Sequence, residues 1–141
     1  MIQPLFNHLN PGHVTTENTS VGKTYEAEDI YFNPGEQKDI FSNVNVRKWS
    51  RVLLYIGVDS SEGDGSIDSI DLQNDFSYTI WFGLSPTSAH RRIISPHFEP
   101  DGNAANLFAE MPVIAPLMLV RVQYNGVHEN VRMRYAQLRL I

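Results

Sequence analysis

The sequence predicts an all-β domain, an antiparallel β-sandwich of jelly-roll type with an extended N-terminal arm. Apolar and polar residues alternate in short runs along most of the 141 residues, whereas the spacing of an amphipathic helix is nearly absent. Gly, Pro, Asn, Asp and Ser separate the runs about every ten residues, which is typical of sandwiches and small barrels. About eight strands fit this pattern, and a small barrel is the alternative architecture.

Residues 1–22 differ from the remainder of the chain because they are polar and contain Pro4, Pro11 and Gly12. We expect an extended arm over residues 1–22 and a single sandwich domain over residues 23–141. A polar arm is ordered only where something holds it, either its own domain or a neighbouring molecule. The second possibility is one reason to expect an assembly.

Three strands are predicted in the first half of the chain. Lys23 to Phe32 and Gln37 to Phe41 are joined by the turn Asn33-Pro34-Gly35. Arg51 to Val58 is the clearest of the three, because apolar side chains occupy both of its faces. A strand of that kind lies in the centre of a sheet or is covered on both sides.

A second group of strands follows the polar loop Asp59 to Gly65. Phe76 to Phe82 alternates clearly, with aromatic and apolar residues on one face and Trp81 among the polar residues of the other. Arg91 to Ile94 and Asn106 to Glu110 are predicted as weaker strands, separated by a loop rich in Pro, Gly and Asn.

The last two predicted strands, Leu117 to Tyr124 and Val127 to Tyr135, flank the dipeptide Asn125-Gly126. Asn-Gly between two alternating runs predicts a β-hairpin, because both turn residues must accept positive φ. The alternation slips before Leu138, which would fall on the outer face. A β-bulge near Ala136 would return it to the core, and the alternative is a sheet that is covered on both sides there.

Composition and motifs exclude several classes of function. Hydrophobic residues make up 42% and charged residues 19%, so we expect a folded globular chain. The chain has no cysteine, which excludes disulfides, thiolate metal sites and cysteine nucleophiles. The sequence contains no Gly-x-Ser-x-Gly nucleophile motif and no glycine-rich phosphate loop. We therefore predict that it is not an enzyme and needs no cofactor.

The first residues have neither the basic start nor the apolar run of a secretory signal. The longest apolar stretch, Met111 to Val120, is interrupted by Pro112 and Pro116 and is too short for a membrane helix. We therefore expect no membrane partner, and a chain that is cytoplasmic or associated with a virion.

Charge is distributed unevenly along the sequence. Residues 1–75 contain twelve acidic and five basic residues, whereas residues 76–141 contain four acidic residues and six arginines. A nucleic-acid binder needs a concentrated basic face, so nucleic acid is not expected as a partner. Opposite charges suit head-to-tail contact between copies, unless the fold interleaves the two halves.

Two acidic patterns are candidates for metal binding. The loop Glu62 to Asp71 places carboxylates around Gly65 and partly resembles a calcium loop, although its flanks are predicted as strands rather than helices. His97-x-Glu99-x-Asp101 places three ligand types on one side of a strand, but no second histidine adjoins His97. Acidic side chains on a solvent-exposed loop are the favoured explanation of each pattern, and no metal site is predicted.

Five residues are candidates for an interface or a ligand site. Trp81 and Trp49 both lie among polar residues, and such aromatics serve as platforms for sugars or partner proteins unless loops of their own domain cover them. Arg121, Arg132 and Arg134 would share one face of the predicted hairpin. Arginines interspersed with leucines are typical of protein interfaces, and ordinary surface arginines are the alternative.

The sequence favours a non-enzymatic structural or interaction protein, a β-sandwich subunit of a homo-oligomer or of a larger assembly. In architecture such a chain resembles the small β-sandwich decoration and fibre proteins of viral and phage particles, and no residue motif carries this resemblance. The alternative is a carbohydrate-binding β-sandwich module that uses Trp81 and Trp49. The expected partners are therefore further copies of the chain, a larger protein assembly, or a glycan.

Overall fold

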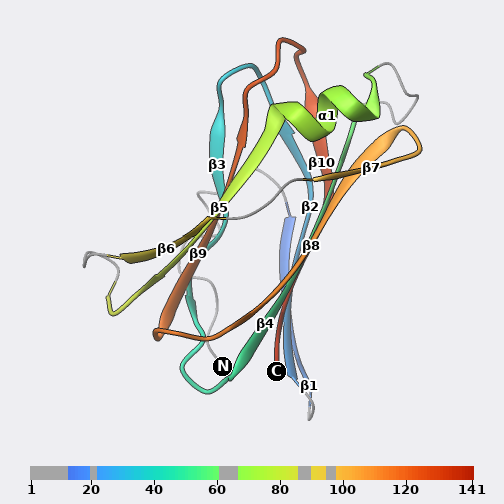
Figure 1. The fold of residues 1–141 in the computed structure, drawn as a ribbon. Coiled ribbons are helices and arrows are strands. Elements are labelled where there is room, and N and C mark those ends of the chain that lie inside the picture. The colour runs from blue at the N-terminus through green and yellow to red at the C-terminus, as the bar shows by residue number, and fades with distance from the viewer. Residues whose placement is uncertain (1–12, 20–21, 61–66, 86–89, 95–97) are drawn as a thin grey trace.

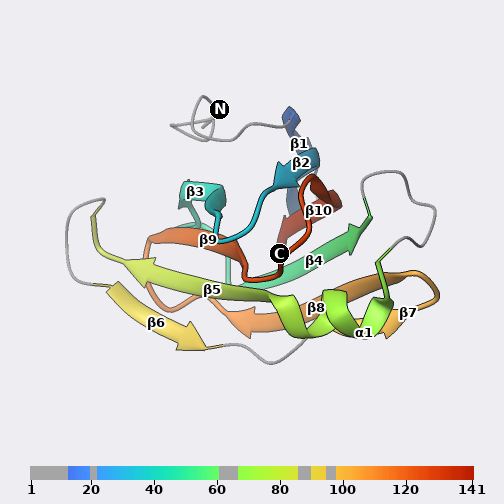
Figure 2. The same ribbon diagram turned by 90° about the horizontal axis from the view of Figure 1, so that it is seen from above.

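The protein is a sandwich of two antiparallel sheets, as the sequence predicts (Figures 1 and 2). The structure is a computed structural model, and it describes residues 13–19, 22–60, 67–85, 90–94 and 98–141. We call the six-stranded sheet, of order β1-β2-β10-β4-β8-β7, the large sheet, and the four-stranded sheet, of order β3-β9-β5-β6, the small sheet. The elements described are β1 (His13–Thr19), β2 (Gly22–Phe32), β3 (Gln37–Asn45), β4 (Arg51–Asp59), α1 (Ser69–Asp75), β5 (Phe76–Gly83), β6 (His90–Ile94), β7 (Glu99–Asp101), β8 (Ala104–Pro112), β9 (Leu117–Tyr124) and β10 (Val131–Leu140).

The core lies between the two sheets and takes alternate side chains from each strand. In β4, Val52, Leu54 and Ile56 are fully buried, whereas the residues between them are only half-buried. β4 pairs with β10 on one side and β8 on the other, which confirms the predicted central strand. β5 and β9 alternate in the same way in the small sheet, so each sheet has one apolar inner face and one outer face free to vary.

Aromatic rings fill the end of the core that lies beneath α1. The ring centroid of Phe76 lies 4.9 Å from that of Tyr124, 5.5 Å from that of Phe32 and 5.9 Å from that of Phe98. Phe98 also packs edge-on against Tyr78 of β5. These contacts pack the two sheets and the segment before β7 against one another. They therefore fix the positions of the strands whose outer faces carry the exposed side chains.

The predicted C-terminal hairpin is wrong. β9 pairs with β3 and β5 in the small sheet, whereas β10 pairs with β2 and β4 in the large sheet. Asn125-Gly126 therefore carries the chain from one sheet to the other. A Cβ atom at Gly126 would collide with the Tyr124 hydroxyl and would lie 2.6 Å from Oδ2 of Asp75. Glycine is required there for close packing and not for a hairpin turn.

The predicted bulge in the last strand is present slightly earlier in the chain than Ala136. The pairing of β10 with β4 shifts between Met133 and Tyr135, so Arg134 is the extra residue. The shift has the expected effect, because Leu138 is fully buried in the core.

Part of the predicted arm is an edge strand of the large sheet. β1 pairs with β2 along its whole length, from His13 opposite Glu28 to Thr19 opposite Gly22. The described part of this segment is therefore held by its own domain, which removes one reason to expect a neighbouring molecule. Residues 1–12 and 20–21 lie outside the described residues.

The helix α1 is missing from the sequence prediction. Asp68 caps its N-terminus, because its Oδ1 accepts a hydrogen bond from the backbone N–H of Ile70 at 2.8 Å. Leu72 is the helix residue that is buried in the core. A seven-residue helix with one buried position has too little periodicity to stand out in the sequence. No helix of the described chain is both long enough and apolar enough to cross a membrane.

The fold interleaves the acidic and basic halves of the chain. Strands from before and after residue 75 lie in both sheets. Ion pairs join the halves at Asp39–Arg121, Asp59–Arg132 and Arg51–Glu110. The uneven charge along the sequence is therefore mixed in space, and it no longer argues for head-to-tail contact between copies.

Candidate functional site

The outer face of the small sheet carries a row of neutral polar side chains. The strand register places Gln37 of β3 opposite Gln123 of β9, and Gln123 opposite Ser77 of β5. The neighbours that alternate with them on β5 and β9, Tyr78 and Val122, are buried in the core. The row therefore faces outward across three adjacent strands, where its amide and hydroxyl groups are available to a ligand.

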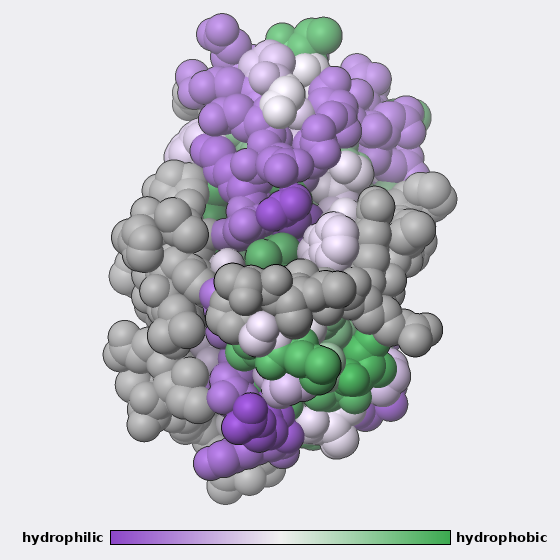
Figure 3. Space-filling model, turned by 90° about the vertical axis from the view of Figure 1, so that its left-hand side faces the viewer, coloured by the Kyte–Doolittle hydropathy of each residue, from purple (hydrophilic) through white to green (hydrophobic). Residues whose placement is uncertain are grey.

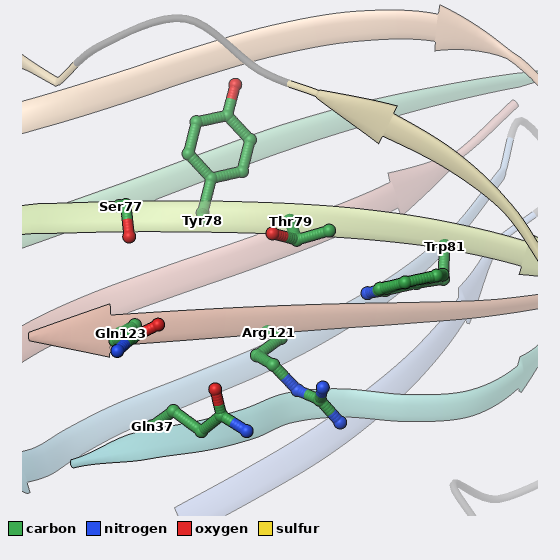
Figure 4. Close-up of a pocket in the computed structure, with 7 residues that line it drawn as sticks. All are labelled: Gln37, Ser77, Tyr78, Thr79, Trp81, Arg121 and Gln123. Atoms are coloured by element: carbon green, nitrogen blue, oxygen red, sulfur yellow. The ribbon is translucent and has the colours of Figure 1, made fainter.

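A second row lies beside the first and ends at an aromatic ring. Asp39 of β3 is opposite Arg121 of β9, which is opposite Thr79 of β5. Trp81 follows two residues after Thr79 on the same face of β5, and it is half-buried. In Figure 4 the Trp81 side chain extends along the strand toward Thr79 and Arg121. The indole ring thus borders the polar rows, as its place on the polar face of the strand predicts.

These side chains surround one open hollow. Its volume is about 210 Å³, less than the roughly 300–1,000 Å³ of pockets that enclose a whole small ligand. Tyr78 contributes to the wall from beneath, and in Figure 4 its side chain points in a different direction from the others. The hollow is open and too small to enclose a whole small ligand. It is lined by Gln37, Ser77, Tyr78, Thr79, Trp81, Arg121 and Gln123.

Arg121 is fixed in the hollow by Asp39. Nε of Arg121 donates to Oδ1 of Asp39 at 2.7 Å, and a terminal nitrogen donates to Oδ2 at 3.3 Å. These hydrogen bonds raise the pKa of Arg121 above its ordinary value, although desolvation opposes them. Two parallel bonds hold the planar guanidinium in one orientation. Its remaining N–H groups are therefore preorganised donors at the edge of the hollow.

Polarity changes along this face of the molecule. Figure 3 looks onto the side of the small sheet and shows hydrophilic side chains over its upper half, with hydrophobic ones gathered lower down. The upper half is the end at which β3 and β5 begin and β9 ends (Figure 1). Trp81 and its cross-strand partner Leu119, which is also half-buried, lie toward the apolar end. A ligand across this face would therefore meet hydrogen-bonding groups at one end and apolar surface at the other.

The structure separates the two predicted tryptophans. Trp49 follows the end of β3, and its partly buried ring packs against the core. Its backbone N–H donates to the carbonyl of Val46 in a turn. Both side chains are partly buried, but Trp49 packs against the core, whereas Trp81 lines the hollow.

The three predicted arginines do not form one stripe. Arg121 belongs to the small sheet, whereas Arg132 and Arg134 belong to β10 of the large sheet. Arg132 donates two hydrogen bonds of 2.9 Å to Asp59, and these bonds raise its pKa. Arg134 is exposed at the bulge. The shared face was inferred from the hairpin, and it is lost because the two strands lie in different sheets.

Neither acidic pattern gathers a metal site within the part of the chain that the structure describes. Of the loop Glu62 to Asp71, residues 61–66 lie outside that part, and Asp68 is occupied as the cap of α1. His97 also lies outside it. Oδ2 of Asp101 accepts a hydrogen bond from Asn106 at 2.8 Å.

The sequence reasoning missed the polar members of the hollow: Gln37, Gln123, Ser77 and Thr79. Each is a common surface residue, and alternation places it on an outer face without saying what lies beside it. The signal is the register across β3, β9 and β5, which brings together residues up to 86 positions apart. Only the sheet order supplies that information.

No protein family model and no curated protein matches the chain. Among solved structures it is similar to the C-terminal CBM6 of LamC, a laminarinase of Zobellia galactanivorans, at 12% identity over 89% of this chain and 86% of that chain, with a TM-score of 0.37. It is also similar to a carbohydrate binding module of Cellvibrio mixtus lichenase 5A in complex with cellotriose, at 12% identity, 92% and 87% coverage and a TM-score of 0.34. A family 35 carbohydrate binding module of Clostridium thermocellum matches at 6% identity, 89% and 86% coverage and a TM-score of 0.31.

Proposed function

We propose that the chain is a carbohydrate-binding β-sandwich module that holds a glycan on the outer face of the small sheet. One observation carries the proposal: Trp81, the fixed guanidinium of Arg121 and four neutral polar side chains border a single open hollow. This was the alternative in the sequence analysis, and the geometry favours it over a subunit role.

The chemistry of a sugar matches the lining of the hollow. A pyranose presents hydroxyl groups, each both donor and acceptor, around an apolar C–H face. Gln37 and Gln123 offer both donors and acceptors, the hydroxyls of Ser77 and Thr79 do the same, and Arg121 offers donors alone. The electron-rich face of an indole ring attracts the C–H face of a sugar. The residues of the hollow thus supply the complement to each part of a sugar ring.

The open shape favours a polysaccharide over a free monosaccharide. A hollow of about 210 Å³ encloses too little of a small ligand to give it much affinity. A longer chain that lies across β3, β9 and β5 makes several weak contacts at once. The proposed ligand is therefore a polymeric glycan whose residues occupy the two polar rows in succession.

Native gel electrophoresis through gels that contain a soluble polysaccharide tests this proposal. A panel of β-glucans, xylan, mannans and pectins covers the main backbone chemistries. At least one of them should retard the chain, and Trp81→Ala should weaken the retardation about tenfold, since stacking and apolar burial together contribute on the order of 1–2 kcal/mol. Gln123→Ala should weaken it less, about threefold.

Trp49→Phe is the matched control, because it alters the other tryptophan and leaves the hollow intact. It should migrate like the unmodified chain in every gel. Melting temperatures of all variants exclude unfolding as the cause of lost binding. If no polysaccharide retards the chain, or if Trp81→Ala and Trp49→Phe behave alike, the proposal is rejected.

The subunit function predicted first has lost three of its supports in the described residues. β1 is held by β2, the three arginines are divided between the sheets, and the acidic and basic halves of the chain are interleaved. Two of those arginines already pair with aspartates. The binding hollow is therefore the better-supported basis for a function.

A further inference from the structure

We infer that the outer face of the large sheet is a second glycan-binding surface, so that one chain holds two polysaccharide strands on opposite sides. The ligand class rests on the proposed function of the small sheet. The surface itself rests on separate observations: a row of aromatic rings, hydrogen bonds that fix two of these rings, and a glycine over which polar groups converge.

The aromatic row crosses three adjacent strands. Tyr55 of β4 is directly opposite Phe108 of β8. On the other side, the ring centroids of Tyr55 and Tyr135 of β10 are 6.1 Å apart, with the planes tilted by 45°. Phe108 is 70% exposed, although it lies within a strand and not at a loop tip. An aromatic side chain in this position leaves its ring open to a ligand. The exposed apolar surface is unfavourable in water, and a strand position with only a structural role does not require it.

Hydrogen bonds hold the two tyrosines in place. The Tyr55 hydroxyl donates to Oδ1 of Asn106 at 3.1 Å, and Asn106 in turn donates to Asp101. The Tyr135 hydroxyl donates to Oε1 of Glu26 at 3.0 Å. The rings are therefore ordered before a ligand arrives, and binding costs little side-chain entropy.

Gly57 forms the floor between these groups. It lies in register between Tyr135 and Asn106. A Cβ atom there would come within 3.1 Å of the Tyr55 hydroxyl, 3.2 Å of Oδ1 of Asn106 and 3.3 Å of a terminal nitrogen of Arg134. Polar groups from three strands thus converge over a backbone position that lacks a side chain. A larger residue at this position would crowd them, so glycine leaves room for them.

Arg134 supplies the donors of this surface. It is the bulge residue of β10, and the bulge aims its exposed side chain over Gly57. Among the described residues it has no ion-pair partner, in contrast to Arg121 and Arg132. The nearby carboxylates of Glu26 and Asp101 already accept hydrogen bonds from neighbouring side chains. The unpaired guanidinium is therefore complementary to the oxygen atoms that a glycan displays.

The geometry makes the chain bivalent. The two surfaces lie on the outer faces of sheets packed about 10 Å apart and point in opposite directions. One extended glycan segment cannot lie on both surfaces, so a protein with both surfaces occupied joins two segments, which belong to different polysaccharide molecules or to distant parts of one molecule. A protein with two binding surfaces cross-links a polysaccharide, whereas a protein with a single binding surface coats it without cross-linking.

Two readouts on the same proteins test this inference: retardation in polysaccharide gels, and light scattering of a polysaccharide solution after the protein is added. The variants are Trp81→Ala, the pair Phe108→Ser with Arg134→Ala, and all three changes together. Val127→Ser is the matched control, because Val127 is an exposed apolar residue outside both surfaces. The unmodified chain and the control should be retarded and should raise the scattering.

Each single-surface protein should stay retarded, about tenfold more weakly, and should no longer raise the scattering. The triple variant should lose both properties. If the Phe108/Arg134 pair binds and cross-links like the unmodified chain, the second surface is refuted and the hollow is unaffected. If Trp81→Ala changes nothing while the pair abolishes binding, the hollow fails and the second surface stands.

Two further outcomes would overturn the inference. In the first, none of the polysaccharides retards the protein, which refutes both surfaces. The second is self-association of the protein alone, measured by light scattering without glycan and abolished by Phe108→Ser. In that case the face is a contact between copies of the chain.

Discussion

The outer faces of the two sheets differ, although their inner faces are built alike. The small sheet carries rows of amide and hydroxyl groups that end at the half-buried Trp81 around a hollow. The large sheet carries a row of aromatic rings, of which Phe108 is mostly exposed. Inner positions are dictated by the core, so they are apolar in both sheets. Outer positions are released from that demand, and their differences carry the information about function.

The two sheets also differ in the burial of their bidentate arginine–aspartate pairs. Arg132–Asp59 lies on the large sheet with side chains 22% and 6% exposed, and Arg121–Asp39 lies on the small sheet with 34% and 26% exposed. The geometry is alike, but the first pair is more fully desolvated. A buried pair leaves a costly unpaired charge when one partner is removed, whereas an exposed pair is screened by water. We therefore expect the first pair to contribute more to the stability of the fold, and the second chiefly to orient the Arg121 guanidinium at the hollow.

The largest expected effect concerns two tyrosines of the core between the sheets. Burial raises the pKa of Tyr25 and of Tyr78 to about 12. Above pH 10 the unfolded chain loses these protons while the folded chain retains them, so the stability is complete below pH 10 and is lost as the pH rises toward 12. The loss should be on the order of 2 kcal/mol per tyrosine. Thermal melts from pH 9 to 12 measure it, and a melting temperature that stays constant would refute it.

The second prediction separates the two ion pairs. Asp59→Asn should lower the free energy of unfolding by about 2 kcal/mol, because Arg132 keeps its charge in a half-buried site and retains only the exposed carboxylate of Asp29, 3.8 Å away. Asp39→Asn should lower it by only about 0.5 kcal/mol. Urea unfolding of both variants measures the difference. Equal losses would show that the two pairs are not distinguished by burial.

The smallest expected effects on stability come from removing one hydroxyl group, either from a tyrosine beneath the hollow or from a tyrosine of the aromatic row. The Tyr78 hydroxyl is buried and has no hydrogen-bond partner among the described residues, so Tyr78→Phe should leave the stability unchanged or raise it slightly. Tyr135→Phe removes the bond to Glu26 and should cost about 1 kcal/mol. Urea unfolding again provides the measurement. The reverse order of the two variants would contradict the hydrogen-bond assignment on the large sheet.

Alternation along single strands predicted much of the fold. β4 was expected as a central strand and β5 as a half-buried one, because each shows its pattern within a few residues. The placement of Trp81 on the outer face of β5 followed from the same pattern. Such features depend on one strand alone, so the sequence suffices for them.

Features that depend on which strands are neighbours were not predictable in this way. Asn125-Gly126 has the composition of a hairpin turn, but Gly126 serves close packing against Tyr124 while the chain changes sheets. The stripe of arginines failed with that hairpin. The polar rows around the hollow were missed for the same reason, because the register between β3, β9 and β5 is a property of the folded sheet.

The most direct test of the account measures the fluorescence of Trp81. The chain has two tryptophans, so Trp49→Phe leaves Trp81 as the sole source of indole emission. Titration with a polysaccharide that retards the chain should change the intensity and wavelength of this emission, and the change should saturate with the same affinity as the gel retardation. Binding that leaves the Trp81 emission unaltered at saturation would contradict the account, because the glycan would then lie elsewhere on the molecule.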